Sequence, residues 1–322
     1  MRAPQKLRAT RVIFFLGVTF APSTPPFAAP RFSRPFALMK SLPALLIALF
    51  ALFALLCVRA SAEALRLQCT PALLPLAKDL VRPLREQGII VKLVEEAGNT
   101  QVVGALGAGE IDVALLTRSL KVDERVSYPA MHFSETTLGM HVVTVVVAQT
   151  VWESGVHALK REQVLNFYEN KTRSWKDVGG EERPMIFFDP AHERGTWEIF
   201  ATWLYGDIHR APAVAWQIVN DGPDTQNTLE FASGGISVAN LRWADRRHVF
   251  PLALIDDAGK AVEPTKANIL DGSYPLTRPI VVVFPREPAA EKKKLLEFLV
   301  GEKGQHILGE HDFTPQSVLT AP

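Results

Sequence analysis

Short apolar runs alternate with amphipathic segments after residue 64, and this alternation restricts the possible folds more than any other feature of the chain. Between the runs, apolar residues recur at helical spacing, as they do in residues 73–84 and around Val102. Strands and helices alternating in this way predict parallel α/β layers. The expected strands here are residues 65–67, 89–94, 111–116 and 141–148, the last almost continuously apolar and β-branched.

The second half of the chain continues the pattern. Residues 186–188 are an expected buried strand, 189–194 an expected loop, and Gly195-Thr196 opens an amphipathic helix. This order directs backbone N–H groups and the positive helix end to one point, which suits an anion. The simpler alternative is that Thr196 only caps the helix. The other expected elements are strands at 252–255 and 280–284 and helices at 160–167, 223–231, 292–299 and 304–308.

The first 62 residues contain eight Lys or Arg and no Asp or Glu. Met39-Lys40 is followed by an uncharged stretch at 41–58 and by Ala60-Ser61-Ala62, the pattern of a secretory signal. We therefore expect translation to start at Met39, cleavage after Ala62, and a periplasmic or secreted protein. The competing interpretation is a membrane anchor, but the run is slightly short of the roughly 20 apolar residues that a spanning helix needs.

Charge and cysteine content exclude several classes of function. The chain has 35 basic and 34 acidic residues, of which 27 basic and 34 acidic follow residue 62. Because there is no basic run and no interleaving of basic with aromatic residues, nucleic acid is not an expected partner. Cys69 would be the only cysteine left after cleavage, and no Cys/His pattern has zinc spacing. We expect no disulfide within the chain, no metal and no cofactor.

Hydroxyl side chains stand at the ends of several expected elements. Thr70, Thr100 and Thr196 lie at junctions that lead into expected helices, and Thr117-Arg118 follows an expected strand. Ligands of open α/β sheets bind just beyond the carboxyl ends of the strands, so these residues are candidates to converge on one ligand. Arg118 has a second interpretation, in which it forms a structural ion pair with Glu110 or Asp112.

Four segments give the chain a resemblance to the periplasmic phosphate-binding proteins of ABC transporters, over most of residues 65–312. They are Ala108-Gly109-Glu110-Ile111-Asp112-Val113-Ala114 with Thr117-Arg118-Ser119-Leu120, Trp175-Lys176-Asp177-Val178-Gly179-Gly180, Gly195-Thr196, and Tyr274-Pro275-Leu276-Thr277-Arg278-Pro279. The resemblance implies a two-lobed α/β fold with a mixed sheet flanked by helices in each lobe and a ligand cleft between the lobes. It also implies a monomer that captures a small oxyanion, with phosphate as the first candidate, for an ABC permease.

The same resemblance implies where the lobes divide. Lobe one would comprise residues 63–142 plus 252–322, and lobe two residues 146–250. The hinge strands would lie near 143–148 and 248–252, and ligand binding would close the lobes about them.

The ligand set implied by the resemblance is Thr70, Thr100, Thr117, Arg118, Arg194, Gly195 and Thr196. Several positions depart from the family: Pro71 and Val102 stand where the family has hydroxyl or glycine residues, and Pro190 replaces its Arg. Arg194 stands at a family Ser position, so the guanidinium is a candidate to have moved along the loop. The alternative is a module that kept the fold and lost the ligand, with a signalling or structural role. An enzyme is not expected, because the chain has no nucleophile elbow and no glycine-rich phosphate loop.

Overall fold

A ten-stranded mixed sheet and a separate three-stranded sheet organise the computed structural model, which describes residues 64–190, 194–214, 216–219, 222–286, 288 and 290–321. The expected start at Met39 and the expected signal segment lie outside the described residues. No helix among the described residues is long and apolar enough to cross a membrane.

The order of the strands in the larger sheet is β2-β1-β3-β12-β4-β8-β6-β7, with β9 and β13 also pairing with β4. The smaller sheet has the order β11-β10-β5. The strands are β1 Leu65–Cys69, β2 Val91–Leu93, β3 Val113–Leu116, β4 Ser134–Ala148, β5 Ala158–Lys160, β6 Ile186–Pro190, β7 Trp216–Val219, β8 Gly235–Asn240, β9 Val249–Pro251, β10 Ala253–Ile255, β11 Ala261–Val262, β12 Thr277–Phe284 and β13 Thr314–Pro315.

Helices connect most of these strands. The α-helices are α2 Leu74–Glu86, α3 Asn99–Gly107, α4 Val122–Ser127, α5 Gln149–Glu153, α6 Arg161–Tyr168, α7 Arg194–Tyr205, α8 Gly222–Phe231, α9 Lys266–Leu270, α10 Glu291–Val300, α11 Glu302–Glu310 and α12 Gln316–Thr320. Short 3-10 turns are η1 Pro71–Leu73, η2 Pro129–Met131, η3 Trp175–Val178 and η4 Leu241–Trp243. The predicted rhythm is confirmed, because β1 pairs in parallel with both β2 and β3.

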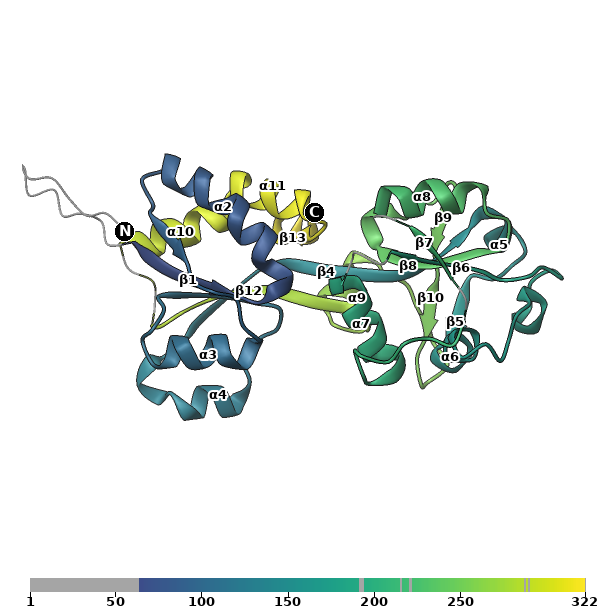
Figure 1. The fold of residues 1–322 in the computed structure, drawn as a ribbon, viewed down its shortest axis with the longest axis horizontal. Coiled ribbons are helices and arrows are strands. Elements are labelled where there is room, and N and C mark those ends of the chain that lie inside the picture. The colour runs from purple at the N-terminus through teal and green to yellow at the C-terminus, as the bar shows by residue number, and fades with distance from the viewer. Residues whose placement is uncertain are drawn as a thin grey trace, which may run out of the picture. The chain divides into compact units, whose positions relative to one another are not determined.

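Strand β4 joins two groups of strands. The first group is β2, β1, β3 and β12, and the second group is β8, β6, β7 and β9. Its first half pairs antiparallel with β12, and its second half pairs antiparallel with β8 and β9 (Figure 1). The sequence predicted only residues 141–148 of this strand. The part that was missed, residues 134–140, begins with the polar run Ser134-Glu135-Thr136-Thr137, and it pairs along its length with β12.

Helices cover both faces of the first group of strands. Val113 and Leu115 of β3 pack in one apolar cluster with α2, α10 and α11, whereas Ala114 and Leu116 pack in another cluster with α3. Figure 1 shows α3 on the face of these strands opposite to α2, α10 and α11. Successive side chains of a strand point to opposite faces, so a strand buried on both sides must be apolar throughout. Burial on both faces therefore explains why the sequence of β3 is apolar at every position.

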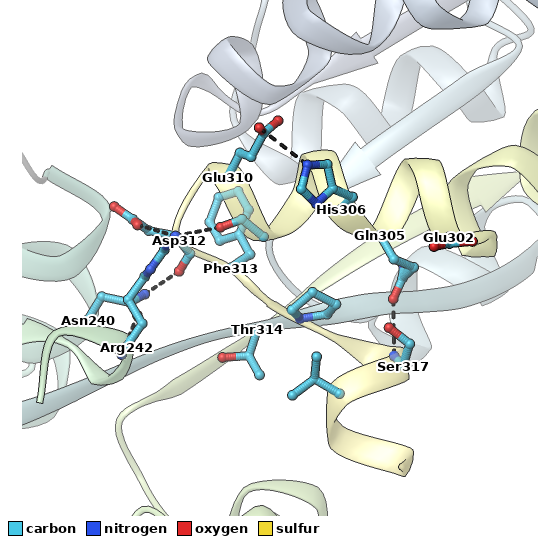
Figure 2. A pocket seen from close by; sticks show the side chains of 13 residues that line it. Asn240, Arg242, Glu302, Gln305, His306, Glu310, Asp312, Phe313, Thr314 and Ser317 are labelled. Atoms are coloured by element: carbon cyan, nitrogen blue, oxygen red, sulfur yellow. Dashed lines mark hydrogen bonds and ion pairs between the residues drawn. The ribbon is translucent and has the colours of Figure 1, made fainter. Parts of the chain in front are cut away.

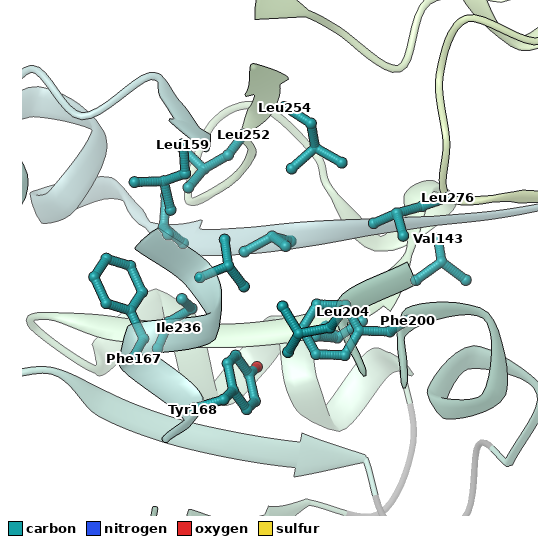
Figure 3. Close-up of a cluster of buried hydrophobic side chains, with 14 of the residues drawn as sticks. Val143, Leu159, Phe167, Tyr168, Phe200, Leu204, Ile236, Leu252, Leu254 and Leu276 are labelled. Atoms are coloured by element: carbon teal, nitrogen blue, oxygen red, sulfur yellow. The ribbon is translucent and has the colours of Figure 1, made fainter. Parts of the chain in front are cut away.

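The core around the second half of β4 contains aromatic residues from α6 and α7. Val143 of β4 packs with Phe167, Tyr168 and Phe200 in one buried cluster (Figure 3). Trp175, from one of the segments that carried the resemblance, is 1% exposed in the same cluster.

Residues that follow β9 also pack in this second core. Strand β10 pairs with β5, and Leu252 and Leu254 belong to the buried cluster of Figure 3. Tyr274 is a member of the same cluster. The hydroxyl of Tyr274 donates to the carbonyl oxygen of Val143 at 3.1 Å. The chain returns to the first group of strands at Thr277, where β12 begins and pairs with β3 and β4. The expected assignment of residues 252–322 to lobe one stays a prediction.

Candidate functional site

Two of the predicted hydroxyl residues lie at one edge of the sheet. Thr70 follows β1, Thr117 follows β3, and the two strands are parallel neighbours. The N–H of Thr70 donates to the carbonyl oxygen of Leu115 at 3.2 Å. The Thr70 side chain is buried, and its hydroxyl has no hydrogen-bond partner among the described residues. A buried hydroxyl without a partner is costly, so this group is available to a ligand.

Asn99, which the sequence reasoning missed, connects this edge to the start of α3. Its Nδ2 donates to the Thr117 hydroxyl at 3.1 Å, and its Oδ1 accepts from the Thr117 N–H at 3.1 Å. Both polar atoms of Asn99 are thereby used within the protein. Because the Thr117 oxygen accepts from Asn99, its own hydrogen remains free to point elsewhere. An Asn directly after a glycine and before a helical segment is the signal that would have indicated this role.

Arg118 forms a bidentate ion pair with Glu124. The distances are 2.8 Å from Nη1 to Oε2 and 2.5 Å from Nη2 to Oε1, and Nη2 also lies 3.4 Å from the Thr100 hydroxyl. The hydrogen bond between them raises the pKa of Arg118 and lowers the pKa of Glu124, so both side chains are charged. The guanidinium therefore lies beside Thr100, but a buried carboxylate already balances its charge.

The interpretation in which Arg118 pairs with Glu110 or Asp112 was wrong. Asp112 pairs instead with Arg66 at 2.9 Å and with Lys292 at 3.4 Å. Glu124 lies in the first turn of α4, where its carboxylate also accepts from the N–H of Lys121 at 2.9 Å. The hydrogen bond from the Lys121 N–H thus orients the Glu124 carboxylate toward Arg118.

Gly195 and Thr196 lie in the first turn of α7, against β4 and β12. The Thr196 hydroxyl is 3.4 Å from Nε2 of His141 on β4, and both side chains are buried. Arg278 on β12 donates to the carbonyl oxygen of Gly195 and to Glu198. His141 and Arg278 were not among the predicted site residues, although His141 is the first residue of the expected strand 141–148 and Arg278 lies in the segment 274–279 that carried the resemblance. The side chains of Pro190 and Arg194 lie outside the described residues. The expectation that a guanidinium at position 194 replaces the one the family has at position 190 therefore stays a prediction.

Burial keeps His141 uncharged. Its pKa is lowered from 6.5 to about 3, first because burial removes the imidazolium from water and second because the Arg278 cation repels it. The imidazole therefore acts near Thr196 as a neutral hydrogen-bonding ring.

Stability should fall in acid because of this histidine. Between about pH 6.5 and about pH 3 the unfolded chain binds a proton at His141 that the folded chain does not, so the free energy of unfolding decreases as the pH falls through this range. Urea unfolding across that range should show a shallower pH dependence for His141→Gln than for the parent. Equal slopes would show that His141 does not titrate as its burial requires.

A separate pocket of about 770 Å³ lies between the end of β8 and the C-terminal helices (Figure 2). Several polar side chains of this pocket pair with each other: Arg242 lies 2.8 Å from Asp312, and His306 lies 3.5 Å from Glu310. Phe313 of this pocket packs edge-on against His141, with ring centroids 5.3 Å apart. None of the predicted ligand residues whose side chains are described lines it. Among the described residues no group of three His, Cys, Asp or Glu side chains is placed to hold a metal.

A family model described as a PBP superfamily domain matches residues 58–303. A curated relative, the phosphate-binding protein PstS of Staphylococcus saprophyticus, is 24% identical over 65% of this chain and 69% of its own length. The matches to two further staphylococcal proteins of the same name span 61% and 59% of those relatives.

Two solved structures are similar in fold. One is a possible phosphate binding protein from Planctomyces limnophilus, with a TM-score of 0.66, 18% identity, and coverage of 80% of this chain and 95% of the other. The second is an ABC-type phosphate transport receptor from Vibrio cholerae, with a TM-score of 0.56, 20% identity, and coverage of 77% and 98%. The TM-scores show that the fold is shared, and at identities this low the similarity extends to the fold alone.

Proposed function

This chain belongs to the PBP superfamily, and on that premise we propose that it captures a small oxyanion, with inorganic phosphate as the first candidate. The predicted two-lobed α/β fold, and a binding protein rather than an enzyme, are confirmed by the family match. The curated relatives carry the name phosphate-binding protein, which makes phosphate the first anion to test.

The observation that carries the proposal is the buried hydroxyl of Thr70, which lies where β1 and β3 end and has no hydrogen-bond partner in the described part of the chain. Thr117 adds a hydroxyl at the same edge, and Thr100 and Arg118 lie together at the start of α3. Oriented hydroxyl and N–H donors stabilise an anion without a net positive charge, because they lose little to screening in a desolvated site.

The start of α7 is the second donor group in the proposal. Helix N-termini present N–H groups that have no partner within the helix, and their dipole favours negative charge. Gly195 and Thr196 lie in the first turn of α7 and are members of the proposed ligand set, and Arg194 stays in that set as a prediction. In this proposal, groups from both parts of the fold enclose the anion in a cleft, and the lobes close over it.

Transport is the proposed context. One structure of similar fold is named as an ABC-type phosphate transport receptor, and the predicted signal would export this chain to the periplasm or the medium. We therefore place the protein outside the cytoplasm as a monomer that delivers its anion to an ABC permease.

Titration calorimetry on the purified protein tests the proposal. We expect saturable binding of one inorganic phosphate per chain, with weaker or no heat from sulfate and nitrate. Phosphate at 100 times its dissociation constant should stabilise the fold by about 2.7 kcal/mol. Small-angle scattering should then show a smaller radius of gyration with phosphate than without it.

A module without a ligand is the second candidate. It is favoured by the ion pair of Arg118 with Glu124 and by Val102, which is fully buried at a position where the family has glycine. Absence of heat and of thermal stabilisation with every anion tested would support this candidate over oxyanion capture.

A further inference from the structure

Two neighbouring side chains of β4 and β12 contact the first turn of α7. His141 and Arg278 are directly paired across these antiparallel strands, so their side chains lie side by side. Arg278 donates from Nη2 to the Gly195 carbonyl oxygen at 3.1 Å and from Nη1 to Oε2 of Glu198 at 3.1 Å. His141 approaches the Thr196 hydroxyl. Three residues at the start of α7 are thus held by two residues of the strands.

Glycine at position 195 permits this close contact. A Cβ atom on Gly195 would lie 3.1 Å from Cε1 of His141 and 3.8 Å from Nη2 of Arg278. The first distance is tighter than ordinary contact, so a side chain here would displace the imidazole or the helix turn. The helix start is therefore seated directly on the two strands.

We infer that Arg278 and His141 are positioning residues that fix the direction of the N–H groups at the start of α7 for oxyanion binding. This inference rests on the proposed function. Two nitrogens of Arg278 donate to Gly195 and Glu198, and the Glu198 carboxylate balances its charge, so in this inference Arg278 acts through these two residues. Its Nε is buried and has no partner among the described residues, so the experiments below include an arm that tests direct contact with the anion. A planar guanidinium suits this task, since its fork can hold two acceptors in a fixed relation.

The central test compares two arginines that contact opposite ends of the same helix. Arg161 donates to the carbonyl oxygens of Trp203 and Leu204, at 2.6 Å each, near the end of α7. We expect Arg278→Gln to weaken the binding of inorganic phosphate by about tenfold, because the first turn loses charge-assisted hydrogen bonds that orient it. Arg161→Gln should bind phosphate as the parent does, even if it lowers the melting temperature as much.

Two further variants separate positioning from direct contact. Glu198→Gln should weaken phosphate binding severalfold, whereas a guanidinium that touched the anion would bind it more tightly once its carboxylate partner was removed. Arg278→Lys should restore part of the affinity, because an ammonium group can still reach one acceptor. Tighter binding by Glu198→Gln, or parent-like affinity in Arg278→Gln, would overturn the inference.

Hydrogen exchange provides a readout that does not need the ligand. Amides of residues 195–201 should exchange faster in Arg278→Gln than in the parent and remain unchanged in Arg161→Gln. Unchanged exchange in Arg278→Gln would overturn the positioning role. A parent protein that does not bind phosphate would instead refute the proposed function, so the two failures are distinguishable.

Discussion

Replacing Arg118 by alanine is expected to weaken phosphate binding by about tenfold to a hundredfold. Hydrogen bonds to charged groups contribute roughly 1.5–3 kcal/mol, and the guanidinium lies beside Thr100 at the start of α3. Calorimetry on the parent and the variant measures the effect. Thr100→Val should lose less, because it removes one neutral donor and leaves the backbone N–H in place.

Glu124→Gln is the matched control for this prediction. It removes the carboxylate charge that pairs with Arg118 but keeps the shape of the side chain. If Arg118 contacts the anion, the uncompensated guanidinium should bind phosphate more tightly in this variant while the fold becomes less stable. If Arg118 is only structural, both variants will lose stability and bind phosphate with the affinity of the parent, and Arg118 then leaves the site.

Replacing Trp175 by alanine should give the largest loss of stability. The side chain is 1% exposed, its Nε1 donates to the carbonyl oxygen of Gly234 at 2.9 Å, and its ring lies 5.7 Å from that of Phe167. Truncation of a buried tryptophan costs about 3–5 kcal/mol, because the transfer energy is lost and a cavity remains. Urea unfolding followed by circular dichroism measures this free energy.

Trp203→Ala is the control for Trp175→Ala. Trp203 is only partly buried at the edge of the same cluster, so its truncation should cost clearly less. Equal losses in the two variants would mean that Trp175 does not have the central packing role that its burial indicates.

Local sequence signals were sufficient where a residue stands at the end of a regular element. Thr70 and Thr117 were located correctly because the apolar runs before them mark where β1 and β3 end, and parallel strands end at a common edge. Gly195-Thr196 was located for a similar reason, since the amphipathic pattern of α7 starts there. These predictions depend on short-range periodicity, which a single sequence contains.

Partners of charged residues were not predictable in the same way. One interpretation paired Arg118 with Glu110 or Asp112, which precede it in the chain, but the carboxylate that reaches it is Glu124, at the start of the helix that follows. Charge alone does not identify the partner, because the path of the intervening turn decides which carboxylate comes within reach.

The sequence by itself determined the α/β alternation, the strands buried on both faces and the residues at the strand and helix ends, because burial and propensity act on neighbouring residues. The tertiary structure alone decided the pairing of β4 with β12, and with it the placement of His141 and Arg278 beneath α7. It also decided that the buried residues between Leu252 and Leu276 pack with the second core. These features depend on contacts between segments far apart in the chain, whose energies appear only once the whole sheet has formed.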